Sequence, residues 1–346
     1  AALKLKNEWE EAGRVLKELA DALGTYEAIC EYADFAHQQN QYAEAETYYK
    51  LCKEKIAVLK RTNPEVYEPR LAAICINLGL IYNKTQRFNE SEQMHKAALD
   101  ISKRLADANP QAYEPFLAAS YSILADLYSN TQRFTESEKM YRIALEIFKR
   151  LVDANPQAYE PALATSYISL AYLYSNTQRF TESEKMHRIA LEIFKRLVDA
   201  NPQAYEPALA ASYISLADLY SNTQRFTESE KMYKAALEIR KRLANANSKA
   251  YEPDLATSYN NLANLYSDTQ RFTESEKMYK AALEIRKRLA DTNPQAYEPL
   301  LADSYNNLAL LYSKTQQFAE SEKMYKSSLE IRKRLADANP QAYEPL

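Results

Sequence analysis

The chain is short of glycine, with only 3 among its 346 residues. Glycine adopts positive φ without steric cost, so tight β-hairpin turns and phosphate-binding loops depend on it. We therefore expect an all-α chain without strands and without a nucleotide-binding loop. No Cys-x-x-Cys, His-Glu-x-x-His or Gly-x-Ser-x-Gly motif occurs either. The sequence predicts no catalytic residue, no metal site and no cofactor, and hence a protein that is not an enzyme.

An excess of charge of one sign and long apolar runs are also missing. The 44 basic and 47 acidic residues nearly cancel, which favours neither nucleic acid nor an anionic membrane as a partner. No run of about 18 apolar residues and no signal-peptide pattern occurs. Cys30, Cys52 and Cys75 are odd in number and lie within helical patterns, so we expect small buried residues and no disulfide framework. These features are typical of a cytoplasmic protein.

What the sequence does contain is a repeat. An Asn-Pro step recurs at intervals that are multiples of 46 residues, at Pro64, Pro110, Pro156, Pro202, Pro294 and Pro340, with Ser248 in the one missing slot. A constant period of this size predicts stacked units that bury their apolar faces against one another. We expect an N-terminal capping helix over residues 1–24 and a solenoid over 25–346. The solenoid would hold seven hairpins, at 25–62, 63–108, 109–154, 155–200, 201–246, 247–292 and 293–338, followed by the start of a further repeat.

The third hairpin shows the pattern of two helices, which we call helix A and helix B. Helix A is expected from Pro115, because proline is favoured at the first helical position. Helix B is expected from Thr135, whose hydroxyl and Glu138 form the spacing of a capping box. Ala125 of helix A is small where the two helices must approach. His95 and His187 occupy the repeat position of Tyr141 and are predicted to pack in the core.

The two ends of the chain differ from the interior hairpins. The first helix carries an apolar stripe and ends at a glycine, which suits a helix that covers one end of the array. The stripe consists of Leu5, Trp9, Ala12, Leu16, Leu19 and Leu23, followed by Gly24. In the last hairpin, we expect an exposed apolar patch around Tyr325, Leu329 and Leu335.

The spacing of the larger residues resembles the tetratricopeptide repeat. The residues that match its signature in the third hairpin are Tyr121, Leu124, Ala125, Tyr128, Phe134, Ser137, Tyr141 and Ala144. The usual repeat has about 34 residues, and the longer unit here looks like the repeats of kinesin light chains and of bacterial proteins related to them. The resemblance implies a right-handed α-solenoid superhelix, in which the A helices line a concave groove that holds peptides or proteins.

Comparison of the hairpins with one another points to the same surface. Hairpins three and four differ at only six positions, and five of these fall on the face of helix A opposite its apolar stripe. The segment TESEKM of helix B is unchanged from hairpin three to hairpin six. We therefore predict that the variable face of the A helices is a ligand groove. Its residues are Ile76, Asn77, Leu80, Phe116, Ser122, Ile123, Asp126, Ile168, Ser169, Tyr172, Ile214, Ser215, Asp218, Asn260, Asn261, Asn264, Asn306, Asn307 and Leu310.

The character of this face changes along the array. It begins acidic with Glu27, Glu31 and Asp34, continues apolar, and ends rich in asparagine, whose amides can bond a peptide backbone whatever its sequence. The sequence thus predicts a protein- or peptide-binding scaffold, and we expect it to be part of a longer protein. Two alternatives stay open at this point: a self-assembling structural array, including head-to-tail association through the last hairpin, and the sensor region of a multidomain signalling enzyme.

Overall fold

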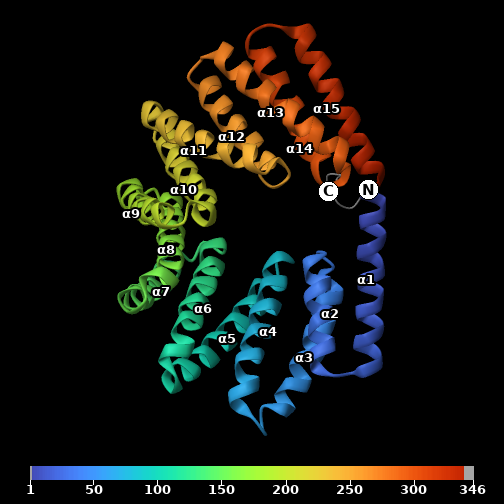
Figure 1. Cartoon of the computed structure of the whole chain (residues 1–346), viewed down its shortest axis with the longest axis vertical. Coiled ribbons are helices and arrows are strands. Elements are labelled where there is room, and N and C mark those ends of the chain that lie inside the picture. The colour runs from blue at the N-terminus through green and yellow to red at the C-terminus, as the bar shows by residue number, and fades with distance from the viewer. Residues whose placement is uncertain (1, 339–346) are drawn as a thin grey trace. The chain divides into compact units, whose positions relative to one another are not determined.

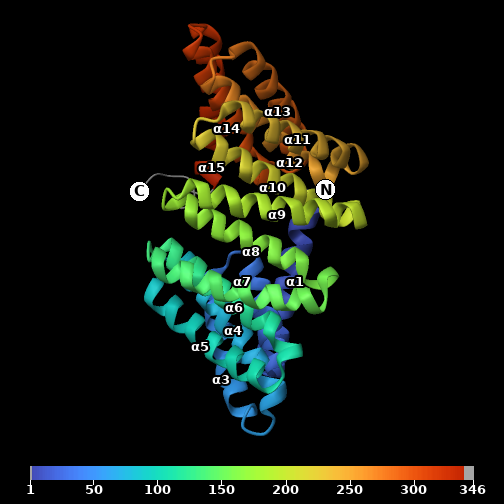
Figure 2. The same ribbon diagram turned by 90° about the vertical axis from the view of Figure 1, so that its left-hand side faces the viewer.

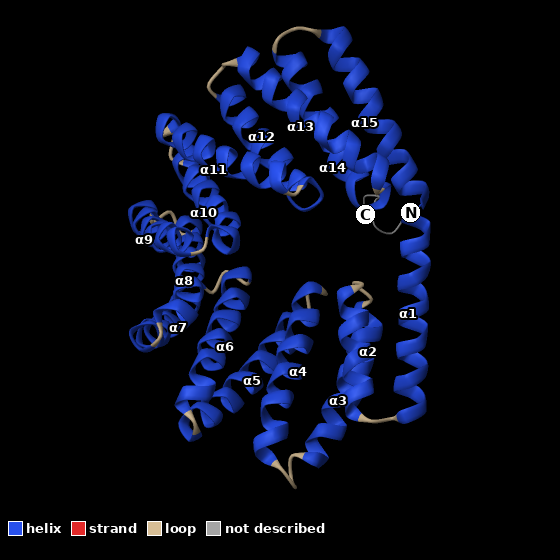
Figure 3. Ribbon diagram, in the orientation of Figure 1, coloured by secondary structure: helices blue, strands red, loops and turns tan. Residues whose placement is uncertain are grey.

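The computed structural model describes residues 2–338, which form fifteen α-helices joined by short loops (Figures 1 and 3). No strand occurs among these residues, so the all-α prediction is confirmed. The helices are α1 (Ala2–Leu23), α2 (Tyr26–Gln38), α3 (Tyr42–Leu59), α4 (Pro64–Lys84), α5 (Phe88–Ala108), α6 (Pro110–Asn130), α7 (Phe134–Ala154), α8 (Pro156–Asn176), α9 (Phe180–Ala200), α10 (Pro202–Asn222), α11 (Phe226–Ala246), α12 (Ser248–Asp268), α13 (Phe272–Thr292), α14 (Pro294–Lys314) and α15 (Phe318–Ala338).

The helices divide into two compact units, Leu3–Met186 and His187–Leu346, with the boundary inside α9. In the first unit each helix from α2 to α8 packs against its neighbours in the sequence. The same order of contacts runs from α10 to α15 in the second unit, where Figure 2 shows α12, α13 and α14 lying side by side. Even-numbered helices from α2 onward are A helices, and odd-numbered helices from α3 onward are B helices. Each unit is therefore a stack of antiparallel hairpins, as expected for an α-solenoid.

Hairpins two to seven are each closed by a small residue on helix A and a serine on helix B, whereas hairpin one has Ala45 in place of the serine. Ala125 has no exposed surface, and its carbonyl accepts a 2.8 Å hydrogen bond from the Ser137 hydroxyl. The same bond recurs 46 residues earlier, from Ser91 to the Gly79 carbonyl, at 2.8 Å. Because a larger residue would force the helices apart, the prediction of a close approach at this position is confirmed.

The predicted helix starts are wrong at two places. Helix α6 begins at Pro110, with the Asn109 side chain accepting from the backbone N–H of Ala112 at 3.2 Å, and Pro115 lies inside the helix. Proline is tolerated there because only one bond, to the carbonyl of the exposed Gln111, is lost. Helix α7 begins at Phe134 without a side-chain cap, so Thr135 forms no capping box. The predicted loop 109–114 is therefore the first part of helix A, capped by Asn109.

The turn between helix A and helix B has glutamine at a position of positive φ, where glycine is the usual residue. Gln132 adopts a φ of 61° in the left-handed region. The Thr131 hydroxyl stabilises the end of α6 by donating to the carbonyl of Leu127 at 2.9 Å. Glutamine stands at the same place in every later hairpin and in hairpin two, again with positive φ. The glutamine backbone thus adopts a conformation that is rare for residues other than glycine. The packing of the two helices imposes this conformation.

The first helix lies against hairpin one, although not with the whole predicted stripe. Gly24 ends α1 with a φ of 59°, as expected for a left-handed cap. Leu16 and Ala20 face the hairpin, whereas Leu19 and Leu23 are exposed. The Trp9 ring stacks on Phe35 with their centroids 6.1 Å apart. The inward face is centred on the small residues because α1 packs closely: a Cβ on Gly13 would meet the Phe35 ring at 2.6 Å.

The last described helix exposes apolar residues that interior hairpins cover. Tyr325 and Leu329 are 39% and 53% exposed, whereas Tyr279 and Leu283, their counterparts in α13, are 6% and 7% exposed. The difference arises because α14 packs on α13. Leu335 is buried, so the predicted patch is right for two of its three members.

Candidate binding surface

The predicted groove residues lie on the A helices, where side chains of successive A helices meet. In the first unit, Asn77 of α4 donates to the Asp34 carboxylate of α2 at 3.4 Å. In the second unit, the Asn307 amide of α14 donates to Asn260 of α12 at 2.8 Å. We call the surface that carries these residues the A-helix face. Its predicted members are exposed or half-buried, apart from the buried Ser215, whose hydroxyl donates to the Ala211 carbonyl at 3.1 Å.

One repeat position divides this face into two kinds of hairpin. At this position Leu80, Tyr172 and Leu310 are large apolar residues that are 36%, 46% and 46% exposed. The residues at the same position in the other hairpins accept a hydrogen bond from a tyrosine hydroxyl of helix B. These bonds join Tyr49 to Asp34, Tyr141 to Asp126, Tyr233 to Asp218, and Tyr279 to Asn264.

The tyrosine hydroxyls were missed by the sequence reasoning, which placed them only in the core. Tyr141 is almost fully buried, yet its hydroxyl reaches the Asp126 carboxylate, fifteen residues earlier. Burial raises the pKa of Asp126, and the hydrogen bond from Tyr141 offsets only part of that effect. Asp218 has a raised pKa for the same reason. The clue in the sequence was that Asp126 and Tyr141 both change between hairpins three and four, to Tyr172 and His187.

His95 stands at the tyrosine position of hairpin two and packs as predicted. It is 2% exposed, and burial lowers the pKa of its imidazole to about 4. The ring lies over Gly79, where a Cβ would come within 2.4 Å of the imidazole Cε1. Within residues 2–338, its Nδ1 has no hydrogen-bond partner. The His95 imidazole therefore occupies the space into which a Cβ at residue 79 would project. Hairpin four combines a buried His187 with a buried Ala171 at the same two positions, so this arrangement of the ring is particular to hairpin two.

The asparagines of the second unit have less bonding capacity for a ligand than the sequence suggested. Asn264 accepts from the Tyr279 hydroxyl at 2.5 Å. Asn260 and Asn307 bond to each other at 2.8 Å. Each amide offers two donor hydrogens and one acceptor oxygen, so part of this capacity is used within the fold. Asn260 and Asn307 thus join two A helices, and Asn264 joins a helix A to a helix B, in addition to any role in binding a peptide backbone.

The constant segment of helix B is held by contacts between hairpins. Glu138 accepts from Arg142 at 2.8 Å, from the Tyr174 hydroxyl at 3.0 Å and from Arg179 at 2.6 Å. Burial opposes ionisation of Glu138, but these three donors lower its pKa. The Arg179 guanidinium also lies 4.2 Å from the Tyr174 ring centroid. TESEKM is thus constant because it joins the hairpins, and its constancy is weaker evidence for a variable ligand face than the sequence comparison implied.

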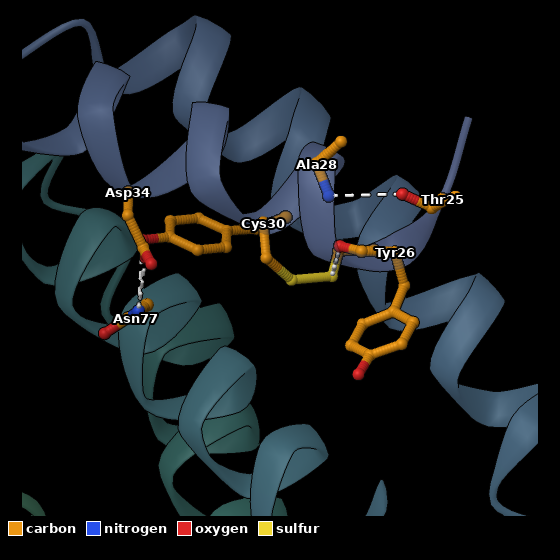
Figure 4. Close-up of a disulfide and its surroundings, with 8 residues drawn as sticks. Thr25, Tyr26, Ala28, Cys30, Asp34 and Asn77 are labelled. Carbon is orange, nitrogen blue, oxygen red and sulfur yellow. Dashed lines mark hydrogen bonds between the residues drawn. A yellow bond between two sulfur atoms is a disulfide. The ribbon is translucent and has the colours of Figure 1, made fainter. Parts of the chain in front are cut away.

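A cavity of about 350 Å³ lies between α2, α3 and α4, at the acidic start of the A-helix face. Its polar lining includes the carboxylates of Glu27, Glu31 and Asp34, together with Arg70 and Asn77. The Asp34 carboxylate is held by Tyr49 and by Asn77, as Figure 4 shows for the second contact. The Arg70 guanidinium lies 5.0 Å from the ring centroid of Tyr26. The cavity is therefore an open, acidic recess with one cation held against an aromatic ring.

A disulfide between Cys30 of α2 and Cys52 of α3 adjoins this cavity (Figure 4). The expectation that the cysteines would form no disulfide is wrong for this pair, and Cys75 alone remains a buried thiol. The two residues are 22 positions apart in the sequence, and the helical pattern gave no sign that they face each other. Hairpin packing brings their Cα atoms to 5.9 Å, within the range that a disulfide spans.

The fold and this surface define a helical-repeat protein whose hairpins stack in an α-solenoid. Models of the tetratricopeptide repeat match residues 162–242, 208–288 and 254–334, and a second such model matches 71–111 and 117–157. The chain belongs to the tetratricopeptide repeat family. Such folds serve as scaffolds for protein interactions and are typically non-catalytic. A search of curated protein sequences found no match.

Solved structures with this fold include a bacterial and a fungal array. BtubC (BKLC) from P. vanneervenii is 25% identical, with a TM-score of 0.60 over 75% of this chain and 94% of that one. The nearly identical TPR-like repeats of a putative kinesin light chain from Podosopora anserina are 17% identical, with a TM-score of 0.51 over 65% and 98%. The predicted resemblance to kinesin light chain-type and bacterial arrays is confirmed.

A third structure holds a bound ligand. The Rap protein complexed with Competence and Sporulation Factor is 17% identical, with a TM-score of 0.52 over 90% of this chain and 76% of that one. At this level of identity the likeness concerns the fold.

Among the helices that the structure describes, none has the length and apolar character needed to cross a membrane.

Proposed function

We propose that this protein binds a protein or peptide segment on its A-helix face. The observation that carries the proposal is the exposure of Leu80, Tyr172 and Leu310, three large apolar residues at one repeat position. Because each of these side chains is already more than half buried, covering the remainder under a ligand contributes about 1 kcal/mol. Their counterparts Asp126 and Asp218 are instead engaged by tyrosines of the core. A hairpin therefore carries either an exposed apolar residue or a tyrosine-bonded polar residue at this position. The surface differs from hairpin to hairpin while the fold stays the same.

The variable positions around this site support the same proposal. Ile168 lies one turn before Tyr172 on α8 and is half-buried, so the two side chains offer a continuous apolar surface within the first unit. Asn260 and Asn307 supply amide groups in the second unit, where they would bond the backbone of an extended ligand. In the first unit the apolar positions are expected to choose the ligand, and in the second unit the amides are expected to hold a ligand backbone.

The test uses a partner recovered by pull-down with the full chain. Ile168→Ala with Tyr172→Ala should weaken binding at least about tenfold, as expected for loss of an interface hot spot. The double change should lower the thermal stability only in part, because Ile168 is half-buried and Tyr172 is 46% exposed. The control is Lys139→Ala, an exposed residue of helix B. If the control abolishes binding and the double variant binds as well as the parent, the A-helix face is not the site.

A second function is favoured by the exposed face of α15. Tyr325 and Leu329 are uncovered within the described residues, and such a patch could associate with a second copy of the chain. Mass measured by light scattering across concentration distinguishes the two functions. A mass that rises with concentration and falls back in Leu329→Glu would support self-association, whereas a monomer at all concentrations would exclude it.

We also propose that the protein is cytoplasmic, and the redox state of its cysteines in cells tests this location. Cytoplasmic thiol pools keep most protein cysteines reduced. Rapid alkylation of cells followed by mass spectrometry should therefore find Cys30 and Cys52 as thiols if the protein is cytoplasmic. A native disulfide between them in intact cells would point to an oxidising compartment.

A further inference from the structure

The acidic cavity and the apolar residues that follow it lie on one unit, on α2, α4 and α8. The cavity carries Glu27, Glu31 and Asp34 on α2. Farther along the A-helix face, Leu80 of α4 and Tyr172 of α8 are exposed. A ligand that spans this face would therefore meet carboxylates at the hairpin-one end and apolar side chains beyond it.

The carboxylates of the cavity are less neutralised than comparable ones elsewhere. In later A helices, a glutamate near the helix start pairs with an arginine of its own hairpin, as Glu114 does with Arg150 at 2.8 Å and Glu206 with Arg242 at 2.7 Å. Within the described part of the chain, Glu27 and Glu31 form no salt bridge. They are one helical turn apart, and like charges at this spacing destabilise a helix. A cationic group in the cavity would relieve that repulsion.

The cation already present does not fill this role. Arg70 lines the cavity, but its guanidinium lies 5.0 Å from the Tyr26 ring centroid and 6.0 Å from that of Tyr67. The lining contains three acidic residues and one basic residue, so the recess keeps a net negative charge. Its volume of about 350 Å³ is large enough for the end of a long side chain. The Asp34 carboxylate is fixed in place by Tyr49 and Asn77, which pre-organises one wall (Figure 4).

We propose that the first unit takes a segment in which a lysine or arginine enters this cavity and apolar residues follow along the A-helix face. This inference rests on the proposed function and names the chemistry of the partner. The cationic group would lie between Glu27, Glu31 and Asp34, and its aliphatic stem would pass along Ala73 and Ile74 of α4. Apolar side chains of the segment would cover Leu80, Ile168 and Tyr172. A strongly acidic segment would be rejected at the hairpin-one end.

The experiment compares terminally blocked peptides on the full chain. The probes are a peptide of about twelve residues that begins with Arg-Leu-Ile-Leu and continues with apolar and polar residues, and its citrulline counterpart, which keeps the shape of arginine without the charge. At about 3.4 Å per residue such a peptide is long enough to extend from α2 toward α8, and each carries a fluorescent label. Dissociation constants come from fluorescence anisotropy. We expect the arginine peptide to bind about fivefold more tightly, as a few partly exposed charge pairs allow, and the preference to shrink at high salt.

Matched variants locate the effect. Glu27→Gln with Glu31→Gln should abolish the preference for arginine, whereas Glu54→Gln with Glu65→Gln removes the same charge from exposed sites outside the cavity and should preserve it. Equal binding of the two peptides, no binding of either, or a preference that survives in the cavity variant would overturn the proposal. If both peptides bind equally and Tyr172→Ala weakens both, the A-helix face remains the site and only the cationic end is wrong.

Discussion

The effect of Gly79→Ala on stability should change sign with the residue at position 95. With His95 in place we expect a loss of stability. Gly79→Ala places a Cβ within 2.4 Å of the buried imidazole, which cannot move out to solvent. Overpacking of this kind costs about 1–3 kcal/mol. The gain in helix propensity from glycine to alanine returns about 1 kcal/mol. Hairpin four accommodates a buried His187 beside Ala171, so the imidazole can shift to relieve part of the clash. We therefore expect a net loss of at most about 1 kcal/mol in the stability of hairpin two.

The reversal is expected when hairpin two receives the residues of hairpin three. Leu80→Asp with His95→Tyr reproduces the pair of Asp126 and Tyr141, which hairpin three combines with the buried Ala125. In that background the new methyl group meets no imidazole, so Gly79→Ala should stabilise by about 0.5–1 kcal/mol. The reverse change in hairpin three, Ala125→Gly, should destabilise and serves as the control.

Native-state hydrogen exchange suits this measurement, because repeat arrays do not always unfold in one step. The amides of α4 and α5 should exchange faster in Gly79→Ala alone. They should exchange more slowly when the same change is added to the double variant that carries Leu80→Asp and His95→Tyr. Amides of α11 and α12, which lie in the other unit, should be unchanged. An increase in protection of α4 and α5 by Gly79→Ala with His95 in place would refute the steric reasoning.

Three further changes test other features of the fold. Asp126→Asn should stabilise at neutral pH, because the raised pKa of Asp126 means that its ionised form costs folding free energy, and Asn264 shows that an amide accepts the same tyrosine bond; urea unfolding should show the gain vanish as the pH falls below about 4, where the aspartate is protonated in both states, and a gain that persists at low pH would contradict this. Reduction of the Cys30–Cys52 disulfide with dithiothreitol should destabilise hairpin one by about 3 kcal/mol, given the 22-residue separation, and exchange should rise in α2 and α3 while α6 and α7 serve as the reference; unchanged α2 and α3 would count against a structural role. Ala263→Leu should cost about 1–3 kcal/mol, because Ala263 has no exposed surface, and the loss should stay in hairpin six and its neighbours; uniform loosening of the second unit would argue against nearest-neighbour coupling.

The stack of helical hairpins could be predicted from the sequence alone, because the sequence pattern of a hairpin is repeated along the chain. The 46-residue interval, the small residue at Ala125 and the apolar spacing around Tyr128 each recur in phase, so one chance match cannot mislead. The A-helix face also followed from the sequence, because five of the six differences between hairpins three and four fall on one side of a helix. Local signals were less reliable: Pro115 and Thr135 resemble helix starts, but Asn109 and Phe134 occupy the actual boundaries.

Contacts between residues far apart in sequence were decided only by the tertiary structure. Helical periodicity gives the direction of a side chain from its own helix and not the residue it meets on the next one. For this reason the bond from Tyr141 to Asp126, the salt bridge from Arg179 to Glu138 and the disulfide from Cys30 to Cys52 became visible only once the hairpins were packed. The sequence had placed Glu27, Glu31 and Asp34 together on one face, but only the packing of α2 against α3 and α4 formed the cavity that they line.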